Sequence, residues 1–369
     1  MIQLKGSFNE AIVFTNDIEP TAQQQVYDLC NLPFLKDEKI RMMPDLHAGK
    51  GCTVGTTMTI TDKIVPNFVG VDIGCGMICV QIDQIKPDID FHKLDQIIRH
   101  NIPSGMNIRK KAHSNAKSFP FHALKTSFNE PRARNSIGTL GGGNHFIELN
   151  EDEDGKIYLV IHSGSRNLGK QVSDAYQQIA IDLLPTRPEK TYLTKHTAYV
   201  DGQEMDDYLH DLALAQQYAA LNRQTMAEVI LEHMGWKNVR TFDTIHNYVD
   251  LDAMILRKGA ISAQNGELVI IPMNMRDGSL ICRGKGNPDW NYSGPHGAGR
   301  LMSRTEAKKN VKLAAFEDAM KDVWSTSVTN ATIDESPFAY KPMDDIVKHI
   351  GETVDIIRTI KPIYNFKAK

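Results

Sequence analysis

The pattern of apolar and polar positions along the chain first indicates β-structure. Apolar runs of strand length recur in pairs, at residues 64–71 with 77–82, 146–149 with 157–161, and 260–263 with 268–271. Asp154-Gly155 and Asn265-Gly266 lie in the second and third gaps, and such dipeptides between apolar runs are typical of β-hairpins. We therefore expect strands over all of these runs, and hairpins at the last two pairs.

Longer segments show helical periodicity instead. Between residues 206 and 234 apolar side chains recur at helical spacing, interrupted by Gln216 and Arg223, and Gly235 follows as a typical C-cap. Residues 304–324 and 342–359 show the same periodicity with charged outer faces. Because helices and strands are mixed without a regular β-α-β alternation, the sequence favours an α+β fold over a doubly wound sheet.

Length and composition restrict the class of protein. With 369 residues the chain can bury a sizeable core, and its 41% hydrophobic and 24% charged residues are ordinary for a globular protein in water. The first residues contain no apolar signal segment, and no run approaches the ~18 apolar residues of a membrane span. The odd number of cysteines, at scattered positions, does not suggest a disulfide framework. We expect a cytoplasmic protein without a membrane partner.

One stretch carries a local excess of positive charge, although the net charge of the whole chain is -3. Between residues 109 and 134 there are seven basic residues and one acidic residue, with Phe119, Phe121 and Phe128 interleaved. One reading is an RNA-contacting loop, with cations on phosphates and aromatic rings on bases. The other is a solvated loop whose phenylalanines anchor it to the core, and from this stretch alone we favour the anchored loop.

Several side chains with metal-binding chemistry lie beside apolar runs, in glycine-rich or polar surroundings. Five share this context: Asp72, Cys75, His145, His162 and His246. Together they would offer oxygen, sulfur and nitrogen donors, a set that suits a borderline transition metal such as Mn, Zn or Fe. A further histidine, His296, lies among small residues with two arginines nearby.

The residues alone leave the role of each side chain open. The candidate ligands are far apart in the sequence, so their convergence in space does not follow from their spacing. A lone histidine after a strand is more often structural than a ligand, and a lone buried cysteine is usually part of the core. For His296 the structural alternative is a histidine placed before a helix. Composition and pattern by themselves support only a soluble metalloenzyme.

Five segments resemble the signature segments of the RtcB family of RNA ligases. They are residues 43–49 (MPDLHAG), 70–77 (GVDIGCGM), 141–148 (GGGNHFIE), 162–166 (HSGSR) and 293–300 (SGPHGAGR). They occur in the family's order, and weaker similarity continues towards the end of the chain, so the resemblance covers nearly all of it. It predicts a single RtcB-like catalytic domain over residues 1–369, with mixed or antiparallel sheets and surrounding helices.

The resemblance implies a reaction. RtcB proteins join an RNA end bearing a 3′-phosphate or a 2′,3′-cyclic phosphate to a 5′-hydroxyl end, using GTP and Mn²⁺. The expected intermediates are a covalent His–GMP and an activated RNA end, RNA(3′)pp(5′)G. The expected partners are RNA and GTP, with archease as a candidate protein partner, and the expected role is RNA repair or tRNA splicing.

The resemblance also assigns residues. One or two Mn²⁺ ions would be held by Asp72, Cys75, His145, His162 and His246. His296 would be the nucleophile that becomes guanylylated, and Asp45 would act on the catalytic groups without touching the substrate. Arg166 would contact phosphate, together with Arg300 and Arg304. The guanosine nucleotide would contact Asn144, Glu148, Asn247, Pro272, Met275, Ser279, Ala298, Gly299, Tyr340 and Lys367.

The sequence departs from the common family pattern at two places near the expected nucleotide. Pro295 precedes the histidine where common members carry Ser or Cys, and residues 272–277 (PMNMRD) differ from the usual loop. The chain is also somewhat short for the family. We therefore hypothesise a shorter bacterial paralogue specialised for RNA repair over tRNA splicing. The alternatives are a metal-dependent cyclic phosphodiesterase that no longer ligates, and a non-ligating RNA-binding paralogue; the presence of His296 argues against both.

Overall fold

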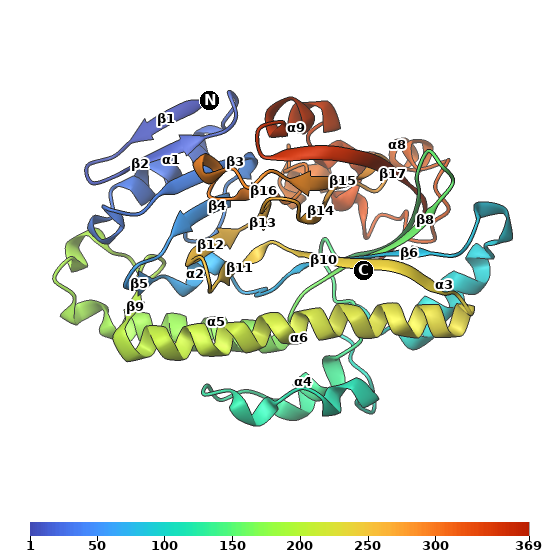
Figure 1. The fold of residues 1–369 in the computed structure, drawn as a ribbon, viewed down its shortest axis with the longest axis horizontal. Coiled ribbons are helices and arrows are strands. Elements are labelled where there is room, and N and C mark those ends of the chain that lie inside the picture. The colour runs from blue at the N-terminus through green and yellow to red at the C-terminus, as the bar shows by residue number, and fades with distance from the viewer. Residues whose placement is uncertain (369) are drawn as a thin grey trace.

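The computed structural model describes residues 1–368 and shows strands gathered above a pair of long helices (Figure 1). The α-helices are α1 (Pro20–Cys30), α2 (Pro66–Val69), α3 (Phe91–Asn101), α4 (Glu130–Ser136), α5 (Arg166–Leu183), α6 (Gly202–Met234), α7 (Arg304–Asn310), α8 (Leu313–Ala319) and α9 (Met343–Ile350). The strands are β1 (Ile2–Lys5), β2 (Glu10–Val13), β3 (Ile40–His47), β4 (Val54–Thr59), β5 (Lys63–Ile64), β6 (Gly76–Ile82), β7 (Phe146–Glu151), β8 (Ile157–Ser163), β9 (Val200–Asp201), β10 (Asn238–Ile245), β11 (Asn247–Asp250), β12 (Ile255–Lys258), β13 (Ala260–Ser262), β14 (Leu268–Asn274), β15 (Gly278–Gly284), β16 (Ser293–Pro295) and β17 (Val354–Lys367). Helices and strands are mixed along the chain, and the sheets contain parallel and antiparallel pairs, so the predicted α+β class is confirmed.

Two larger sheets organise most of the strands. One has the strand order β1-β2-β3-β4-β12-β11, and the other has the order β10-β6-β8-β7-β17-β15-β14. The seven-stranded sheet curls until its edge strands meet, where the Ile270 N–H donates a hydrogen bond to Thr244 Oγ1 at 3.2 Å. Apolar side chains that include Met77, Val160 and Ile281 fill the space inside the curl.

The β7–β8 hairpin and strand β6 form as predicted. β8 pairs with β7 on one side and with β6 on the other. Asp152 stabilises the hairpin turn, since its Oδ1 accepts the N–H groups of Asp154 and Lys156 at 3.0 and 2.9 Å. Gly155 supplies the left-handed conformation that the turn needs, with φ 77°.

The ends of four neighbouring strands, β10, β6, β8 and β7, lie side by side at one end of the seven-stranded sheet. The register places Gly76 opposite both Ser163 and Ile245, and Phe146 opposite His162. The residues just before β6 and β7, and just after β10, therefore lie beside the end of β8. These strand ends bring together sequence segments that are up to about 170 residues apart.

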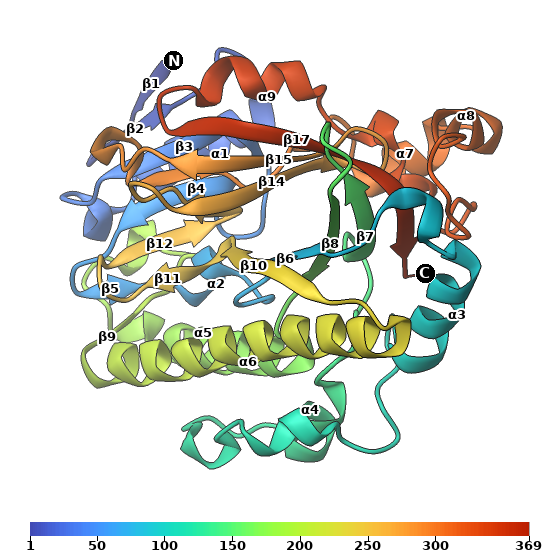
Figure 2. The same cartoon turned by 45° about the vertical axis from the view of Figure 1, so that its right-hand side comes forward.

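Helices α5 and α6 pack side by side beneath the strands, and α6 runs across most of the molecule (Figures 1 and 2). α6 begins at Gly202, four residues before the predicted start, and it ends as predicted, because Gly235 caps it with a left-handed φ of 72°. Arg223, which interrupts the apolar stripe of this helix, is fully buried, and so is its neighbour Asn222.

Two of the strand predictions are wrong in part. Residues 64–71 do not form one strand, because Pro66 begins the short helix α2, and proline suits the first turn of a helix. Residues 260–263 and 268–271 do lie in strands but do not form a hairpin. β13 pairs with β16 and β14 pairs with β15, because Ala263 and Gly266 form backbone hydrogen bonds with residues 284–292.

The last two helix predictions are also wrong in part. Residues 304–324 divide into α7 and α8, since Val311 between them is extended (φ -87°, ψ 131°). In residues 342–359 the helix α9 ends at Ile350, and β17 begins at Val354. The β-branched residues of β17 pair with β15 and β7 in the middle of the sheet, so the tertiary partners override the helical periodicity.

The basic stretch at residues 109–134 is anchored by its aromatic side chains. Phe119 and Phe121 are buried and pack edge-on against Tyr218 of α6. The guanidinium of Arg134 lies over the Phe121 ring at 4.3 Å. The interpretation of this stretch as an anchored loop is therefore supported.

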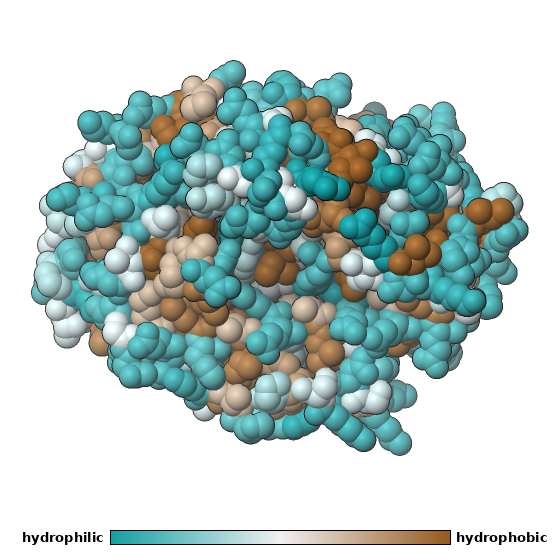
Figure 3. All heavy atoms as spheres, viewed as in Figure 1, coloured by the Kyte–Doolittle hydropathy of each residue, from teal (hydrophilic) through white to brown (hydrophobic). Residues whose placement is uncertain are grey.

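The surface and the cysteines agree with the composition. The face drawn in Figure 3 is mostly hydrophilic, with hydrophobic residues in several separate groups. Within residues 1–368, none of the helices is long and apolar enough to span a membrane. The five cysteines are buried and free, as expected for a chain without a disulfide framework.

Candidate active site and metal centre

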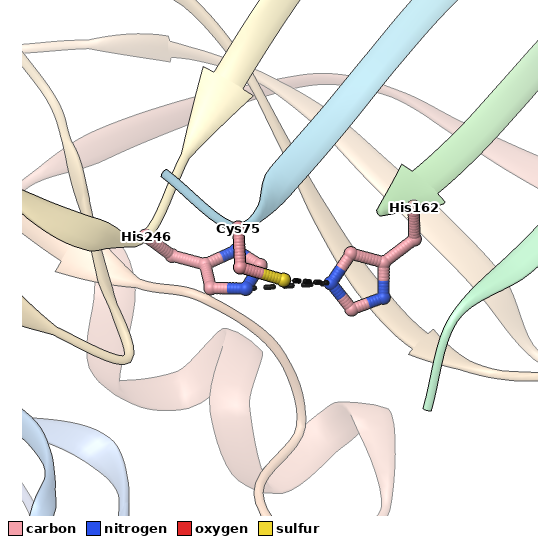
Figure 4. Close-up of side chains that lie close together, drawn as sticks. All are labelled: Cys75, His162 and His246. Carbon is pink, nitrogen blue, oxygen red and sulfur yellow. Dashed lines mark hydrogen bonds between the residues drawn. The ribbon is translucent and has the colours of Figure 1, made fainter. Parts of the chain in front are cut away.

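Three side chains from distant parts of the chain converge at the neighbouring strand ends of the seven-stranded sheet (Figure 4). Cys75 precedes β6, His162 lies near the end of β8, and His246 follows β10. The Cys75 Sγ and His246 Nε2 atoms each lie 3.3 Å from His162 Nε2. All three side chains are buried.

Asp72 and His145 extend this cluster. The His145 Nε2 atom lies 3.5 Å from Cys75 Sγ and 3.0 Å from Asp72 Oδ2. The donor atoms form two groups of three, each within 4.8 Å, and both groups contain Cys75. The structure thus brings the five predicted ligands together, in two groups that share one thiol.

The spacing and the protonation of these donors fit a metal ion. Ligands bound to one ion at about 2.0–2.3 Å lie about 3–4 Å from each other, which matches the contacts in the cluster. The Nδ1 atoms of His145 and His162 lie 2.8 and 3.3 Å from the carbonyl oxygens of Leu140 and Asn144. A carbonyl only accepts hydrogen bonds, so each Nδ1 holds the proton and each Nε2 presents a lone pair. Converging lone pairs repel each other unless a cation lies among them.

Burial keeps the imidazoles neutral. It lowers the pKa of His162 and His246 well below the ordinary value, and neighbouring histidines lower it further. Burial, followed by the charge of Asp72, raises the pKa of the Cys75 thiol well above its ordinary value. A bound cation reverses this effect on the thiol, because metal-coordinated cysteine is deprotonated. The donor set therefore suits a divalent transition metal.

His296 lies beside the cluster and is held by Asp45. Its ring centre is 5.0 Å from that of His246. The fully buried Asp45 accepts the backbone N–H groups of His296 and Gly297 through Oδ2, both at 3.1 Å. The same oxygen lies 2.6 Å from His296 Nδ1, in a close contact that is not aligned as a hydrogen bond. The carboxylate thus fixes the ring and leaves Nε2 on the side away from it.

A cavity of about 430 Å³ contains both His296 and four residues of the cluster in its wall, and this volume is within the range of ligand pockets. Most of the residues predicted to contact the nucleotide also line it: Asn144, Glu148, Asn247, Pro272, Met275, Ala298, Gly299, Tyr340 and Lys367. Ser279 does not; it is buried opposite Pro272 in the β14–β15 pair. Asp45 and His145 lie behind the lining and contact residues in it.

Arg166 lies outside the lining of this cavity. Its guanidinium donates to Thr139 Oγ1 at 3.2 Å and to the Gly105 carbonyl at 2.9 Å, and it fills the space that a side chain at Gly141 would need. Arg166 therefore supports the glycine-rich loop that precedes His145. Its two predicted companions, Arg300 and Arg304, do line the cavity.

Glu148 is a buried carboxyl in the cavity wall. Asn365 lies opposite it in the β7–β17 pair and donates to its Oε1 at 2.6 Å. Burial raises the pKa of Glu148 to about 7, although the hydrogen bond from Asn365 and the charge of Lys367 act against this rise. This carboxyl therefore titrates close to neutral pH, where a bound ligand can change its ionisation.

Glu335 is a charged group that the sequence did not reveal. Its buried carboxylate lies 2.8 Å from Lys367 Nζ and 2.7 Å from both the Tyr340 hydroxyl and Arg304 Nη1. Burial opposes its ionisation, but Lys367 and Arg304 outweigh burial and lower the pKa of Glu335. The segment around Glu335 has no long helix or strand, so it gives no periodic signal. Asn365 was also missed, although the two-residue period of a strand places it on the face of Lys367.

The fold and the cluster define a candidate metalloprotein with a nucleotide-sized cavity, and comparison with known proteins gives its family. Residues 25–125 and 121–368 match the family described as tRNA-splicing ligase RtcB. The chain is 33% identical to RNA-splicing ligase RtcB of Escherichia coli (strain K12), with 95% of each chain covered. The chain belongs to the RtcB family, as its signature segments predicted.

Two further relatives show how widely the similarity extends. The chain is 30% identical to RNA-splicing ligase RtcB2 of a second Escherichia coli strain, over 95% of this chain and 93% of that protein. It is 27% identical to tRNA-splicing ligase RtcB of Aeropyrum pernix, over 87% of this chain and 86% of that protein. The similarity thus extends over most of the length in bacterial and archaeal relatives.

Proposed function

We propose that this chain is a cytoplasmic RNA ligase that joins 3′-phosphate or 2′,3′-cyclic phosphate ends to 5′-hydroxyl ends, using GTP and Mn²⁺. We further propose that residues 1–369 act as one catalytic domain. The relatives are named as RNA-splicing and tRNA-splicing ligases. The observation that carries the proposal is the position of His296, which Asp45 holds beside His246 in the cavity that Glu148 also lines. A nucleophile, a metal cluster and a base-binding carboxyl in one cavity are what nucleotidyl transfer requires.

The cluster at the strand ends would hold the metal, as one ion or as two ions that share Cys75. Bound Mn²⁺ would neutralise phosphate charge and orient the pyrophosphate leaving group. The protein's contribution is to keep the donors in place: the two imidazole tautomers are fixed by backbone carbonyls. A reducing cytoplasm keeps the Cys75 thiol available.

His296 would react through Nε2, because its Nδ1 faces Asp45. The Nε2 lone pair attacks the α-phosphorus of GTP, an N–P bond forms, and pyrophosphate leaves with the electrons of the broken P–O bond. An RNA 3′-phosphate then attacks the same phosphorus and releases His296, giving RNA(3′)pp(5′)G. The 5′-hydroxyl of the second RNA attacks the phosphorus on the RNA side, loses its proton, and displaces GMP. A 2′,3′-cyclic phosphate would first be opened by water.

The rest of the cavity would bind the nucleotide and the RNA end. Arg300 and Arg304 line it, and a guanidinium offers a forked donor for phosphate oxygens. Ionised Glu148 can accept two hydrogen bonds from the Watson–Crick edge of guanine, from N1–H and from the 2-amino group. Tyr340 presents an aromatic ring that can stack on the base. By the family resemblance, archease is the candidate protein partner.

Glu148→Gln should weaken GTP binding and remove its dependence on pH. An amide offers one acceptor where the carboxylate offers two, so we expect the Kd for GTP to rise about 10–100-fold. In the unaltered protein the Kd should rise as the pH falls below about 7, the pKa of Glu148 in the free protein, because guanine binds the ionised form. The slope approaches about tenfold per pH unit. Calorimetric titration at pH 6 and pH 8 measures both effects.

ATP titrated in parallel is the control for protonation of the phosphates. The same pH slope for GTP in Glu148→Gln as in the unaltered protein would assign the titration to another group.

The stability of the folded protein gives an independent check on the pKa of Glu148. Because the pKa of Glu148 is raised from 4.5 to about 7, its protonated form contributes stability that is complete below pH 4.5 and lost as the pH rises through about 7. The variant should lack this loss.

The ligase function is tested with two short RNAs, one ending in a 2′,3′-cyclic phosphate and one beginning with a 5′-hydroxyl. We expect a joined product that requires both GTP and Mn²⁺. The same RNAs carrying a 3′-hydroxyl and a 5′-phosphate should not be joined. An RNA that is only opened to its 3′-phosphate would replace this proposal with the cyclic phosphodiesterase.

Repair of cleaved RNA is the role that we propose over tRNA splicing. Pro272, Asn274 and Met275 of the unusual loop line the cavity, and Pro295 directly precedes His296. A cleaved hairpin RNA and a pair of tRNA halves, compared at equal concentration, test this role. Faster joining of the tRNA halves would contradict it.

A further inference from the structure

Arg223 is a fully buried arginine on α6 that the reaction above does not use. It forms a forked ion pair with Asp243 of β10, with Nε 2.8 Å from Oδ1 and Nη2 2.5 Å from Oδ2. Its remaining nitrogen, Nη1, donates to the carbonyl oxygens of Gly74 at 2.7 Å and Ser163 at 2.9 Å. One guanidinium thus joins three separate segments of the chain.

Each of these three segments carries a proposed metal ligand. The two carbonyls belong to the residues next to Cys75 and His162, and the carboxylate belongs to β10, the strand that leads into His246. These are the three residues that face one another in Figure 4. Arg223 therefore holds the backbone beside all three ligands from the side of the helix.

Asn222, the preceding residue of α6, reaches the remaining histidine. Its Oδ1 accepts two backbone N–H groups of the loop before Leu140, at 2.8 and 3.0 Å, and its Nδ2 donates to Ser163 Oγ at 3.1 Å. Ser163 Oγ donates in turn to the Leu140 carbonyl at 2.8 Å, and the same carbonyl fixes His145 Nδ1. Asn222 is thus connected to the group that sets the tautomer of His145.

Stability alone does not account for a charge at this position. Arg223 has no exposed side-chain surface, whereas the side chain of its partner Asp243 is 35% exposed. Burying a guanidinium carries a large desolvation cost, and an apolar residue of similar volume is often as stable. The forked geometry is used in full, since the guanidinium contacts both carboxylate oxygens and two carbonyls.

We infer that Asn222 and Arg223 are positioning residues of the metal centre. Two adjacent side chains of one helix set the strand ends that carry Cys75, His145, His162 and His246. Groups that orient metal ligands in this way commonly change metal affinity when they are replaced. The inference rests on the proposed metal centre and is independent of the ligation reaction.

The test is the affinity of the purified full-length protein for Co²⁺ alone, followed by the absorption that appears when a thiolate binds Co²⁺. Arg223→Lys keeps the charge but loses the fork, so its three ammonium donors cannot reproduce the four contacts of the guanidinium. We expect its Kd for Co²⁺ to be about 10–100-fold higher. Asp243→Asn removes only the charged anchor in β10 and should raise the Kd by a smaller factor.

Arg257→Lys is the matched control. Arg257 is also fully buried, and it donates to Ser293 Oγ at 2.8 Å and to the Tyr248 hydroxyl at 2.9 Å. Neither of these residues is adjacent in the sequence to a proposed metal ligand. The Arg257→Lys variant should have a lower melting temperature and an unchanged affinity for Co²⁺.

The outcomes separate the inference from the proposal beneath it. An unchanged Co²⁺ affinity in folded Arg223→Lys overturns the positioning role and leaves the metal centre standing. If that variant does not fold, an unchanged affinity in Asp243→Asn overturns the role in the same way. An unaltered protein that gives no thiolate absorption with Co²⁺ overturns the metal centre, and the positioning role falls with it.

Discussion

Replacement of His296 by alanine will abolish covalent labelling of the protein by α-labelled GTP in the presence of Mn²⁺. Alanine has no lone pair to attack phosphorus, so we expect labelling to fall by at least about a thousandfold. In the unaltered protein the label should be lost in acid and kept in alkali, as expected of a phosphorus–nitrogen bond. Denaturing gels of the labelled protein measure the effect.

His122→Ala is the control for this experiment, because His122 is an exposed histidine outside the cavity wall. It should be labelled like the unaltered protein. Labelling of normal strength in His296→Ala would place the nucleophile elsewhere. Absence of label in the unaltered protein at every Mn²⁺ concentration would favour the cyclic phosphodiesterase, and opening of a cyclic phosphate would then be measured.

Cys75→Ala will strongly weaken metal binding and remove ligation. Cys75 is the donor that the two groups of ligands share, so its loss weakens each of them. We expect the Kd for Co²⁺ to rise by at least about a hundredfold, beyond the usual effect of residues that only orient ligands. The thiolate absorption should disappear, and no RNA should be joined with GTP and Mn²⁺.

Cys79→Ala is the matched control for the thiol. Cys79 lies in the same strand, β6, and is also fully buried, but it packs in the apolar cluster inside the curled sheet. Burial raises the pKa of its thiol, and Cys79 belongs to neither group of candidate metal ligands. Its replacement should cost about 1 kcal/mol of stability and preserve Co²⁺ binding. Normal Co²⁺ affinity in Cys75→Ala would instead exclude this thiol as a ligand.

The strand ends could be predicted from the sequence, but their meeting could not. The apolar runs of β6, β7 and β8 locate Cys75, His145 and His162 at strand ends. Their convergence depends on register between strands, such as Gly76 opposite Ser163, and the sequence pattern within one strand does not contain that information. Family resemblance supplied the grouping that local pattern could not.

The part of the cavity wall that contains Glu335 and Lys367 was harder to predict. The sequence pattern over residues 342–359 indicates a helix, whereas residues 354–367 form β17, because long-range pairing outweighs local periodicity. This strand supplies Asn365 and Lys367. Glu335, which pairs with Lys367, ends a three-residue 3₁₀-helix (Ile333–Glu335), and so short an element gives no periodic pattern that marks buried positions. Arg166 is a different case: its motif was clear in the sequence, but its guanidinium contacts Thr139 and Gly105 and is not part of the cavity lining.

The place of β17 in the sheet has a consequence for how the protein is made. This strand lies late in the sequence, yet it is inserted between β7 and β15. While the ribosome is still synthesising residues 354–367, β7 and β15 both have unpaired edges, and unpaired edges promote aggregation. Nascent chains that stop before this strand would lack both a closed sheet and Lys367. Premature termination of translation should therefore give an insoluble product instead of a partly active one.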